Sequence, residues 1–179
     1  MKVLLLTNIP APYMLEYLKE LGKKCELTVL FERAKASDRD KKWDSYKFEN
    51  FEGKILKGIA FGREMALCFG VLKYLKKNKY DMVIVANPLT PTGIISILKL
   101  KRKKIPFCIQ SEGGFQGSGK GLKEKFKKYI VGSADFYLSG MGSLEDNYFA
   151  MYGGKGKPIY DYPFASTKKE QIKSRPLTK

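Results

Sequence analysis

Five short and almost continuous apolar runs recur along the chain, at residues 2–7, 25–32, 81–87, 105–110 and 134–139. Each run is rich in aliphatic, β-branched or aromatic residues, which favours a β-strand. The runs do not alternate between apolar and polar residues, and this indicates strands that are buried on both faces. Such strands are typical of a parallel sheet that is covered by helices.

Segments with helical periodicity separate these runs. Apolar residues repeat at helical spacing in four sets: Met14, Leu18 and Leu21; Leu67, Val71, Tyr74 and Leu75; Leu122, Phe126, Tyr129 and Ile130; Leu144, Tyr148 and Tyr152. Each set predicts one buried helical face, and residues 92–104 predict a further helix that ends in basic residues. Residues 33–65 predict a loop and weaker strands around 46–51 and 53–58. We therefore expect an α/β fold with a doubly wound, mostly parallel sheet and helices on both faces, as in Rossmann-like domains.

Charge and composition narrow the function classes. The 179 residues include 34 Lys and Arg, 18 Asp and Glu and no His, giving a net charge of +16 at pH 7. Nucleic acid, an anionic membrane and phosphorylated ligands are all candidate partners of such a surface. The lack of histidine and of paired cysteine spacing argues against a zinc or other metal site and against Ser-His or Cys-His catalysis.

The sequence shows neither a signal peptide nor a membrane span, and this predicts a cytoplasmic protein that is soluble or peripheral on a membrane. The apolar stretch 3–7 is too short for a signal peptide, and no stretch of the sequence is long enough for a membrane span. Cys25, Cys68 and Cys108 are odd in number, and two of them lie in apolar runs, which suits a reducing compartment.

Polar segments that are rich in Gly or Pro follow four of the predicted strands. The carboxyl ends of parallel strands meet at one edge of a sheet, where doubly wound domains bind their ligands. We therefore predict a binding site there that is formed by Asn8, Pro10, Tyr13, Asn87, Thr90, Ser111, Glu112, Gly113, Gly114 and Ser139. The alternative interpretation is that these segments are ordinary turns, which favour the same residue types for steric reasons.

Glu112 lies directly between a buried strand and two glycines. Its carboxylate has two possible roles: it accepts hydrogen bonds from ligand hydroxyls, or it accepts them from backbone N–H groups of the turn. The loop after the first strand lacks the G-x-G-x-x-G pattern, and the chain has no Walker A loop. We therefore expect no NAD or ATP cofactor.

Ten Lys and Arg residues lie between Lys99 and Lys128. Seven of them predict a patch that binds an anionic membrane: Lys101, Arg102, Lys103, Lys104, Lys123, Lys127 and Lys128. The alternative is an ordinary amphipathic helix with solvated lysines. A basic nucleic-acid-binding domain or a stand-alone nucleotide-binding domain would suit the charge or the fold, but the basic segments lack interleaved aromatic residues and the chain lacks a phosphate loop.

Four stretches together resemble the N-terminal half of retaining glycosyltransferases of family 4. They are "MKVLLLTNIPAPYMLEYLKELGKKCELTVLFERAKASDRDKKW", "NPLTPTG", "KKIPFCIQSEGGF" and "YGGKGKPIYDYPFAS". The resemblance covers most of residues 1–166. It implies a GT-B enzyme, in which this Rossmann-like N-terminal domain binds mainly the acceptor. Residues 167–179 would begin the linker to a C-terminal donor domain that this chain lacks.

The resemblance also implies a function. The full-length enzyme would transfer a sugar from a nucleotide-diphosphate donor, with retention, to a glycan or lipid-linked acceptor in cell-envelope polysaccharide synthesis. The nucleotide-sugar is then a substrate and not a cofactor, and the catalytic residues are unassigned. We expect this chain alone to be inactive, because the family's paired-glutamate donor motif belongs to the absent half. The chain departs from the family in having Pro10 and Pro12 where many relatives have glycine, and Glu112 near the place of a common histidine.

Overall fold

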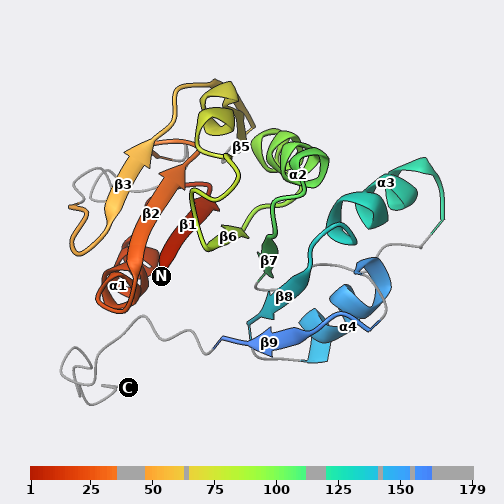
Figure 1. Cartoon of the computed structure of the whole chain (residues 1–179). Coiled ribbons are helices and arrows are strands. Elements are labelled where there is room, and N and C mark those ends of the chain that lie inside the picture. The colour runs from red at the N-terminus through yellow and green to blue at the C-terminus, as the bar shows by residue number, and fades with distance from the viewer. Residues whose placement is uncertain (36–46, 63–64, 112–119, 141–142, 154–155, 163–179) are drawn as a thin grey trace, which may run out of the picture.

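The computed structural model describes residues 1–35, 47–62, 65–111, 120–140, 143–153 and 156–162, so the predicted linker 167–179 lies outside the described residues. Seven parallel strands form one sheet in the order β3-β2-β1-β6-β7-β8-β9 (Figure 1). Their bounds are β1 Lys2–Thr7, β2 Glu26–Phe31, β3 Glu52–Ile55, β6 Met82–Val85, β7 Cys108–Ser111, β8 Phe136–Ser139 and β9 Ile159–Asp161. Two further strands, β4 (Ile59–Phe61) and β5 (Met65–Leu67), pair as a small antiparallel hairpin.

Helices cover both faces of the sheet. They are α1 Pro12–Gly22, the 3-10 helix η2 Phe69–Lys73, α2 Pro91–Lys103, α3 Leu122–Val131 and α4 Ser143–Tyr152. Buried side chains of α1 pack with one face of the strands, in a cluster that includes Met14 and Leu18. Buried side chains of α2, α3 and α4 pack with the other face, together with η2. The predicted doubly wound, Rossmann-like α/β fold is confirmed.

The strand order brings the carboxyl ends of β1, β2 and β6 together. β1 lies between β2 and β6, so the direction in which the chain builds the sheet reverses between β1 and β6. The pairing continues past the strands, because Glu32 N donates to Thr7 O (3.0 Å) and Ala86 N donates to Leu6 O (2.9 Å). The first residues after each strand are therefore neighbours at this edge. Ligands of doubly wound sheets bind at such a switch point.

The start of α2 is set by local chemistry. Thr90 is the N-cap, and its Oγ1 accepts a hydrogen bond from Gly93 N (3.0 Å). Pro91 stands at the first helical turn, where its missing N–H costs nothing. A side chain at Gly93 would place its Cβ 2.0 Å from Asn87 O, so only glycine lets the loop after β6 pass this close to the helix.

The segment 67–75 is not the predicted helix. Leu67 instead pairs with Ile59 in the β4-β5 hairpin, and a short 3-10 helix follows. Thr92 holds the end of the hairpin against α2, because Thr92 Oγ1 accepts from Cys68 N (3.0 Å) and donates to Ala66 O (2.6 Å). These contacts between distant segments override the local helical spacing.

The region 33–65 agrees with the prediction in part. β3 lies where a weaker strand was expected around 53–58. The prediction of a strand around 46–51 is wrong, since the described residues 47–51 form no strand. Phe48 packs its ring on Phe31 instead, with the ring centroids 5.4 Å apart, and so covers β2 on the α1 side. None of the described helices is long and apolar enough to cross a membrane.

Candidate functional site

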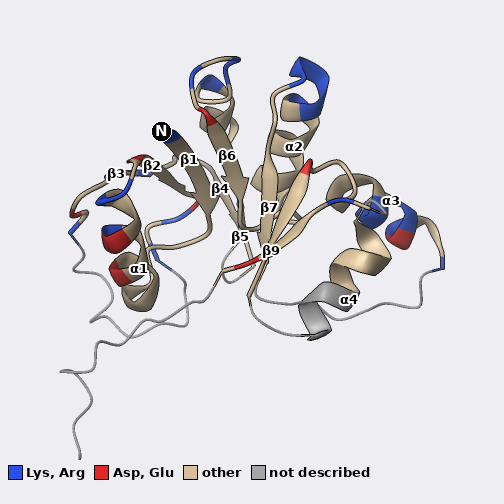
Figure 2. Cartoon of the chain, turned by 60° about the horizontal axis from the view of Figure 1, so that its bottom comes forward, with Lys and Arg blue, Asp and Glu red and all other residues tan. Residues whose placement is uncertain are grey.

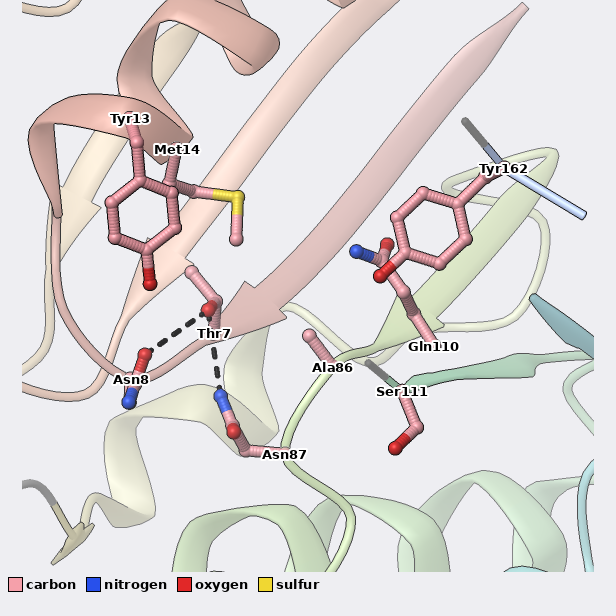
Figure 3. A pocket seen from close by; sticks show the side chains of 9 residues that line it. All are labelled: Thr7, Asn8, Tyr13, Met14, Ala86, Asn87, Gln110, Ser111 and Tyr162. Carbon is pink, nitrogen blue, oxygen red and sulfur yellow. Dashed lines mark hydrogen bonds between the residues drawn. The ribbon is translucent and has the colours of Figure 1, made fainter. Parts of the chain in front are cut away.

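A pocket of about 240 Å³ opens at the carboxyl edge of the sheet, at the switch point between β1 and β6 (Figure 3). It is lined by Thr7, Asn8, Tyr13, Met14, Ala86, Asn87, Gln110, Ser111 and Tyr162. We call it the switch-point pocket. Its lining comes from the ends of β1, β6 and β7, from the first turn of α1 and from the residue after β9.

A chain of hydrogen bonds orders one wall of the pocket. Asn87 Nδ2 donates to Thr7 Oγ1 (3.4 Å), and Thr7 Oγ1 donates to Asn8 Oδ1 (3.4 Å). Ile9 N also donates to Asn8 Oδ1 (2.9 Å), which sets the orientation of that amide. Figure 3 shows Thr7 between the two asparagines. This wall is therefore preorganised and presents polar atoms from two adjacent strands.

Gln110 supplies the opposite wall. Its side chain is only 2% exposed, and its Oε1 has no hydrogen-bond partner among the described residues. Figure 3 shows this amide beside Tyr162, across the pocket from Tyr13. A buried acceptor without a partner costs about 1–3 kcal/mol, so native proteins keep few of them. A ligand hydroxyl in the pocket would supply the missing donor.

The lining of the switch-point pocket is polar but uncharged. Three amides and four hydroxyls line it, and none of the nine described lining residues is acidic or basic. Such groups match a neutral ligand with many hydroxyls, because each amide and hydroxyl pairs with an alcohol without leaving a charge desolvated. A diphosphate would find no cation among these described lining residues.

The structure brings together four of the predicted site residues: Asn8, Tyr13, Asn87 and Ser111. Three others lie elsewhere, and Glu112, Gly113 and Gly114 fall outside the described residues. Pro10 is buried away from the lining, and Ser139 is fully buried at the end of β8, opposite Ser111 in register. Thr90 caps α2 and contacts Glu32 instead.

The sequence reasoning missed five lining residues: Thr7, Met14, Ala86, Gln110 and Tyr162. Gln110 carries a signal that was available, because it is the one amide in an otherwise apolar strand run. A buried strand that ends in an amide either satisfies that group internally or offers it to a ligand.

Glu32 is a second feature that the sequence reasoning missed. It follows β2 directly, is 1% exposed, and its two carboxyl oxygens contact Thr90 Oγ1 (2.6 Å) and Ala66 N (3.2 Å). Thr90 Oγ1 also lies 3.0 Å from Asn87 O, to which it donates. Thr90 Oγ1 is thus within donating distance of both Glu32 Oε1 and Asn87 O, and its single proton serves one of them at a time. Burial raises the pKa of Glu32 to about 7, although the hydrogen bonds from Thr90 and Ala66 N lower it.

The predicted membrane patch lies on the last turn of α2 and on α3 (Figure 2). Lys101 Nζ stands 3.7 Å from the ring centroid of Tyr129, which joins the two helices. Lys127 differs from the other six residues of the patch. It is half-buried, and its Nζ lies 3.9 Å from the ring centroid of Tyr152 and 4.8 Å from that of Tyr148.

The predicted buried face of residues 122–130 is wrong for most of its length. Leu122 is 84% exposed, Phe126 46% and Tyr129 49%, whereas Ile130 is buried with Val131. The reason is the position of α4, which packs against the side of α3 that carries Glu124 and Lys127. The hydroxyl of Tyr152 donates to Glu124 there, and the Lys127 ammonium lies over the tyrosine rings.

Comparison with known proteins leaves the family unassigned. No family model matches this chain, and a search of curated proteins finds no match. The resemblance to family 4 glycosyltransferases therefore stays a prediction. Within the described part of the chain, no three His, Cys, Asp or Glu side chains are grouped so that they could hold a metal ion.

Proposed function

We propose that this chain is the acceptor-binding domain of a retaining glycosyltransferase of family 4, and that the switch-point pocket binds hydroxyls of its glycan or lipid-linked acceptor. The observation that carries the proposal is the buried Gln110 Oε1, which lacks a partner among the described residues and lies in an uncharged polar pocket. A sugar hydroxyl is the donor that this oxygen requires.

The shape and chemistry of the lining support a sugar over a nucleotide phosphate. Amides and hydroxyls surround the pocket, and the partly exposed ring of Tyr13 offers an apolar surface to the C–H face of a pyranose. A few hydrogen bonds of about 1 kcal/mol each give an affinity in the millimolar range, so this domain alone is expected to bind acceptor weakly. Transfer would need the donor domain, and the role of the residues described here is to hold and orient the acceptor.

Binding of neutral sugars to the isotope-labelled chain, followed by NMR, tests the proposal. We expect a hexose or a disaccharide to shift the amide signals of Asn8, Asn87 and Ser111. Gln110→Leu keeps the size and the burial of the side chain but removes the acceptor. The fold should remain, and the sugar affinity measured from the shifts should fall by about tenfold.

The matched control is Asn78→Gly, because Asn78 lies in an exposed turn at the opposite edge of the sheet and has a φ of 59°, which glycine adopts readily. This variant should bind sugar as the unaltered chain does. Shifts that are absent for every sugar, or that persist in Gln110→Leu, would contradict the proposed role of the pocket.

A second part of the proposal concerns the membrane. The exposed row Leu122, Phe126 and Tyr129 is flanked on α3 by Lys123, Lys125 and Lys128. Apolar side chains beside lysines are the pattern of a helix that lies in an anionic membrane interface, where each lysine contributes about 1 kcal/mol. A lipid-linked acceptor would be presented at that surface.

Co-sedimentation with lipid vesicles tests this part. The chain should bind anionic vesicles, bind less as salt rises, and bind more weakly after Phe126→Ser, which changes no charge. Phe69→Ser is the control, since Phe69 is also exposed but lies on η2. Equal binding to neutral vesicles, or tighter binding to single-stranded RNA at the same salt, would count against a membrane partner.

A further inference from the structure

A second pocket, of about 390 Å³, opens at the carboxyl ends of β2 and β3. It is lined by Glu32, Arg33, Ala34, Lys35, Leu56, Lys57, Gly58, Ala60 and Ala66. We call it the basic pocket. Its chemistry differs from that of the switch-point pocket, because three of its nine described lining residues are cations.

Parallel pairing places these cations side by side. β2 and β3 pair in register with Phe31 opposite Ile55, and Leu56 N donates to Phe31 O (2.8 Å) just past the strands. Arg33 and Lys57 therefore follow neighbouring strand ends. The side chain of Arg33 also donates to Gly62 O (3.3 Å), which joins it to the turn of the β4-β5 hairpin.

The hairpin forms the far wall and is tied to the sheet by Glu32. Ala66 N donates to Glu32 Oε2 (3.2 Å), and Cys68 Sγ donates to Glu32 O (3.3 Å). Glu32 is the one acidic residue among the described lining residues of the basic pocket. Burial raises the pKa of the Glu32 carboxyl to about 7, so much of this group is neutral near neutral pH. A neutral Glu32 then adds no negative charge beside Arg33 and Lys57 among the described lining residues of the basic pocket.

The two pockets share a wall. Arg33 N donates to Asn8 O (2.9 Å), so the backbone that carries a cation of the basic pocket is bonded to a lining residue of the switch-point pocket. Glu32 N likewise donates to Thr7 O (3.0 Å). A ligand that places hydroxyls in one pocket and an anionic group in the other would therefore cross the backbone of residues 32 and 33.

We propose that the basic pocket binds a phosphate group carried by the acceptor, so that the acceptor is a phosphorylated sugar. Arginine and lysine are suited to this group, since a guanidinium donates two parallel hydrogen bonds to phosphate oxygens and an ammonium adds a point charge. The sugar part of this inference rests on the proposed function, in which the switch-point pocket binds sugar hydroxyls. The phosphate part depends on the basic pocket alone.

Titrations of the labelled chain with inorganic phosphate, a neutral hexose and the hexose 6-phosphate test the inference by NMR. Phosphate should shift Arg33, Lys57 and Gly58, and the hexose should shift the switch-point pocket. The hexose 6-phosphate should shift both sets and bind about tenfold more tightly than either part alone. Arg33→Gln and Lys57→Gln should each weaken phosphate binding by about tenfold and leave hexose binding unchanged.

Lys24→Gln is the matched control, because Lys24 is exposed at the opposite edge of the sheet, just before β2. It should leave phosphate binding unchanged. Phosphate shifts spread over all lysines, or equal losses in Lys24→Gln and Lys57→Gln, would overturn the inference and leave only non-specific attraction. Tighter binding of inorganic pyrophosphate than of the hexose 6-phosphate would also overturn it, since the group would then belong to the donor.

These outcomes separate the two proposals. If inorganic phosphate shifts no signals of the unaltered chain while the hexose does, the basic pocket is refuted and the switch-point pocket stays as proposed. Phosphate shifts without any hexose shifts would support the basic pocket and contradict the sugar-binding function.

A pH series with sulfate gives an independent readout, since the charge of sulfate is constant over this range. Sulfate should bind about threefold more tightly at pH 6 than at pH 8, because an anion in the pocket and a charged Glu32 disfavour each other. Among the described residues, the other charged or titratable groups that line this pocket are Arg33, Lys35 and Lys57, and Cys68 Sγ contacts Glu32 O. The start of α2 contributes Thr90 and Thr92. Glu32→Gln should remove the pH dependence, and a dependence that persists in this variant would refute the coupling.

Discussion

Replacement of Glu32 by glutamine should make the protein more stable at neutral pH. The Glu32 carboxyl is buried between β2, the hairpin and the start of α2, and contacts Thr90 Oγ1 and Ala66 N. In the protonated form it donates to Thr90 and accepts from Ala66. A glutamine amide reproduces both bonds, because its NH₂ group donates and its carbonyl accepts. Glutamine, unlike glutamate, never carries a buried charge.

The size of the expected gain in stability follows from the raised pKa of Glu32. Burial raises the pKa of Glu32 from 4.5 to about 7, so between these values the folded state holds a proton that the unfolded state has lost. The contribution of the Glu32 carboxyl to the free energy of unfolding is therefore fully present below pH 4.5 and is lost as the pH rises through 7. A shift of this size corresponds to about 3 kcal/mol. Glu32→Gln should match the unaltered chain near pH 4.5 and exceed its free energy of unfolding by up to about 3 kcal/mol at pH 8.

Urea unfolding at pH 5, 6, 7 and 8 measures this difference. Glu26→Gln is the control, since it removes a carboxyl from the exposed start of β2 and leaves the buried Glu32 carboxyl in place. If Glu32→Gln has the same pH dependence as the unaltered chain, the carboxyl is not protonated in the folded state at neutral pH. If Glu32→Gln is less stable than the unaltered chain at pH 8, the glutamine amide does not replace the hydrogen bonds of the protonated carboxyl.

Two further predictions concern the core. Gly93→Ala should destabilise the protein by about 3 kcal/mol in urea unfolding, because its Cβ would lie 2.0 Å from Asn87 O; an unchanged midpoint would show that the loop can move aside. Cys108 is fully buried and burial raises its pKa to about 12, so a maleimide at pH 8 should modify the partly exposed Cys25 first, as measured by mass spectrometry. Modification of Cys108 at an equal rate would indicate opening of the sheet.

Most of the sheet was predictable from local pattern. A strand that is buried on both faces is apolar along most of its length, and each of the five predicted runs overlaps one strand of the sheet. β9 gave no such signal, since it has three residues that are all exposed. The β4-β5 hairpin was missed for a different reason: Leu67 fits the helical spacing with Val71, and the pairing with Ile59 that overrides it joins separate segments.

Part of the candidate site was predictable as well. Asn8, Asn87 and Ser111 each follow or end a strand, and parallel strands deliver such residues to one edge. Gln110 and Glu32 were missed because each stands within or at the end of an apolar run, where a polar residue is taken as part of the strand. Their importance depends on partners far away in sequence, such as Thr90 and Ala66 for Glu32.

Helix α3 shows what the sequence determines by itself and what only the tertiary structure decides. Its spacing of Leu122, Phe126 and Tyr129 is visible in the sequence, and it defines an apolar row along one side of the helix. Periodicity cannot say whether that row is covered, because burial depends on where other elements lie. In the folded chain, α4 offers tyrosine rings and a hydroxyl to Lys127 and Glu124, so the more polar side of α3 turns inward and the apolar row stays exposed.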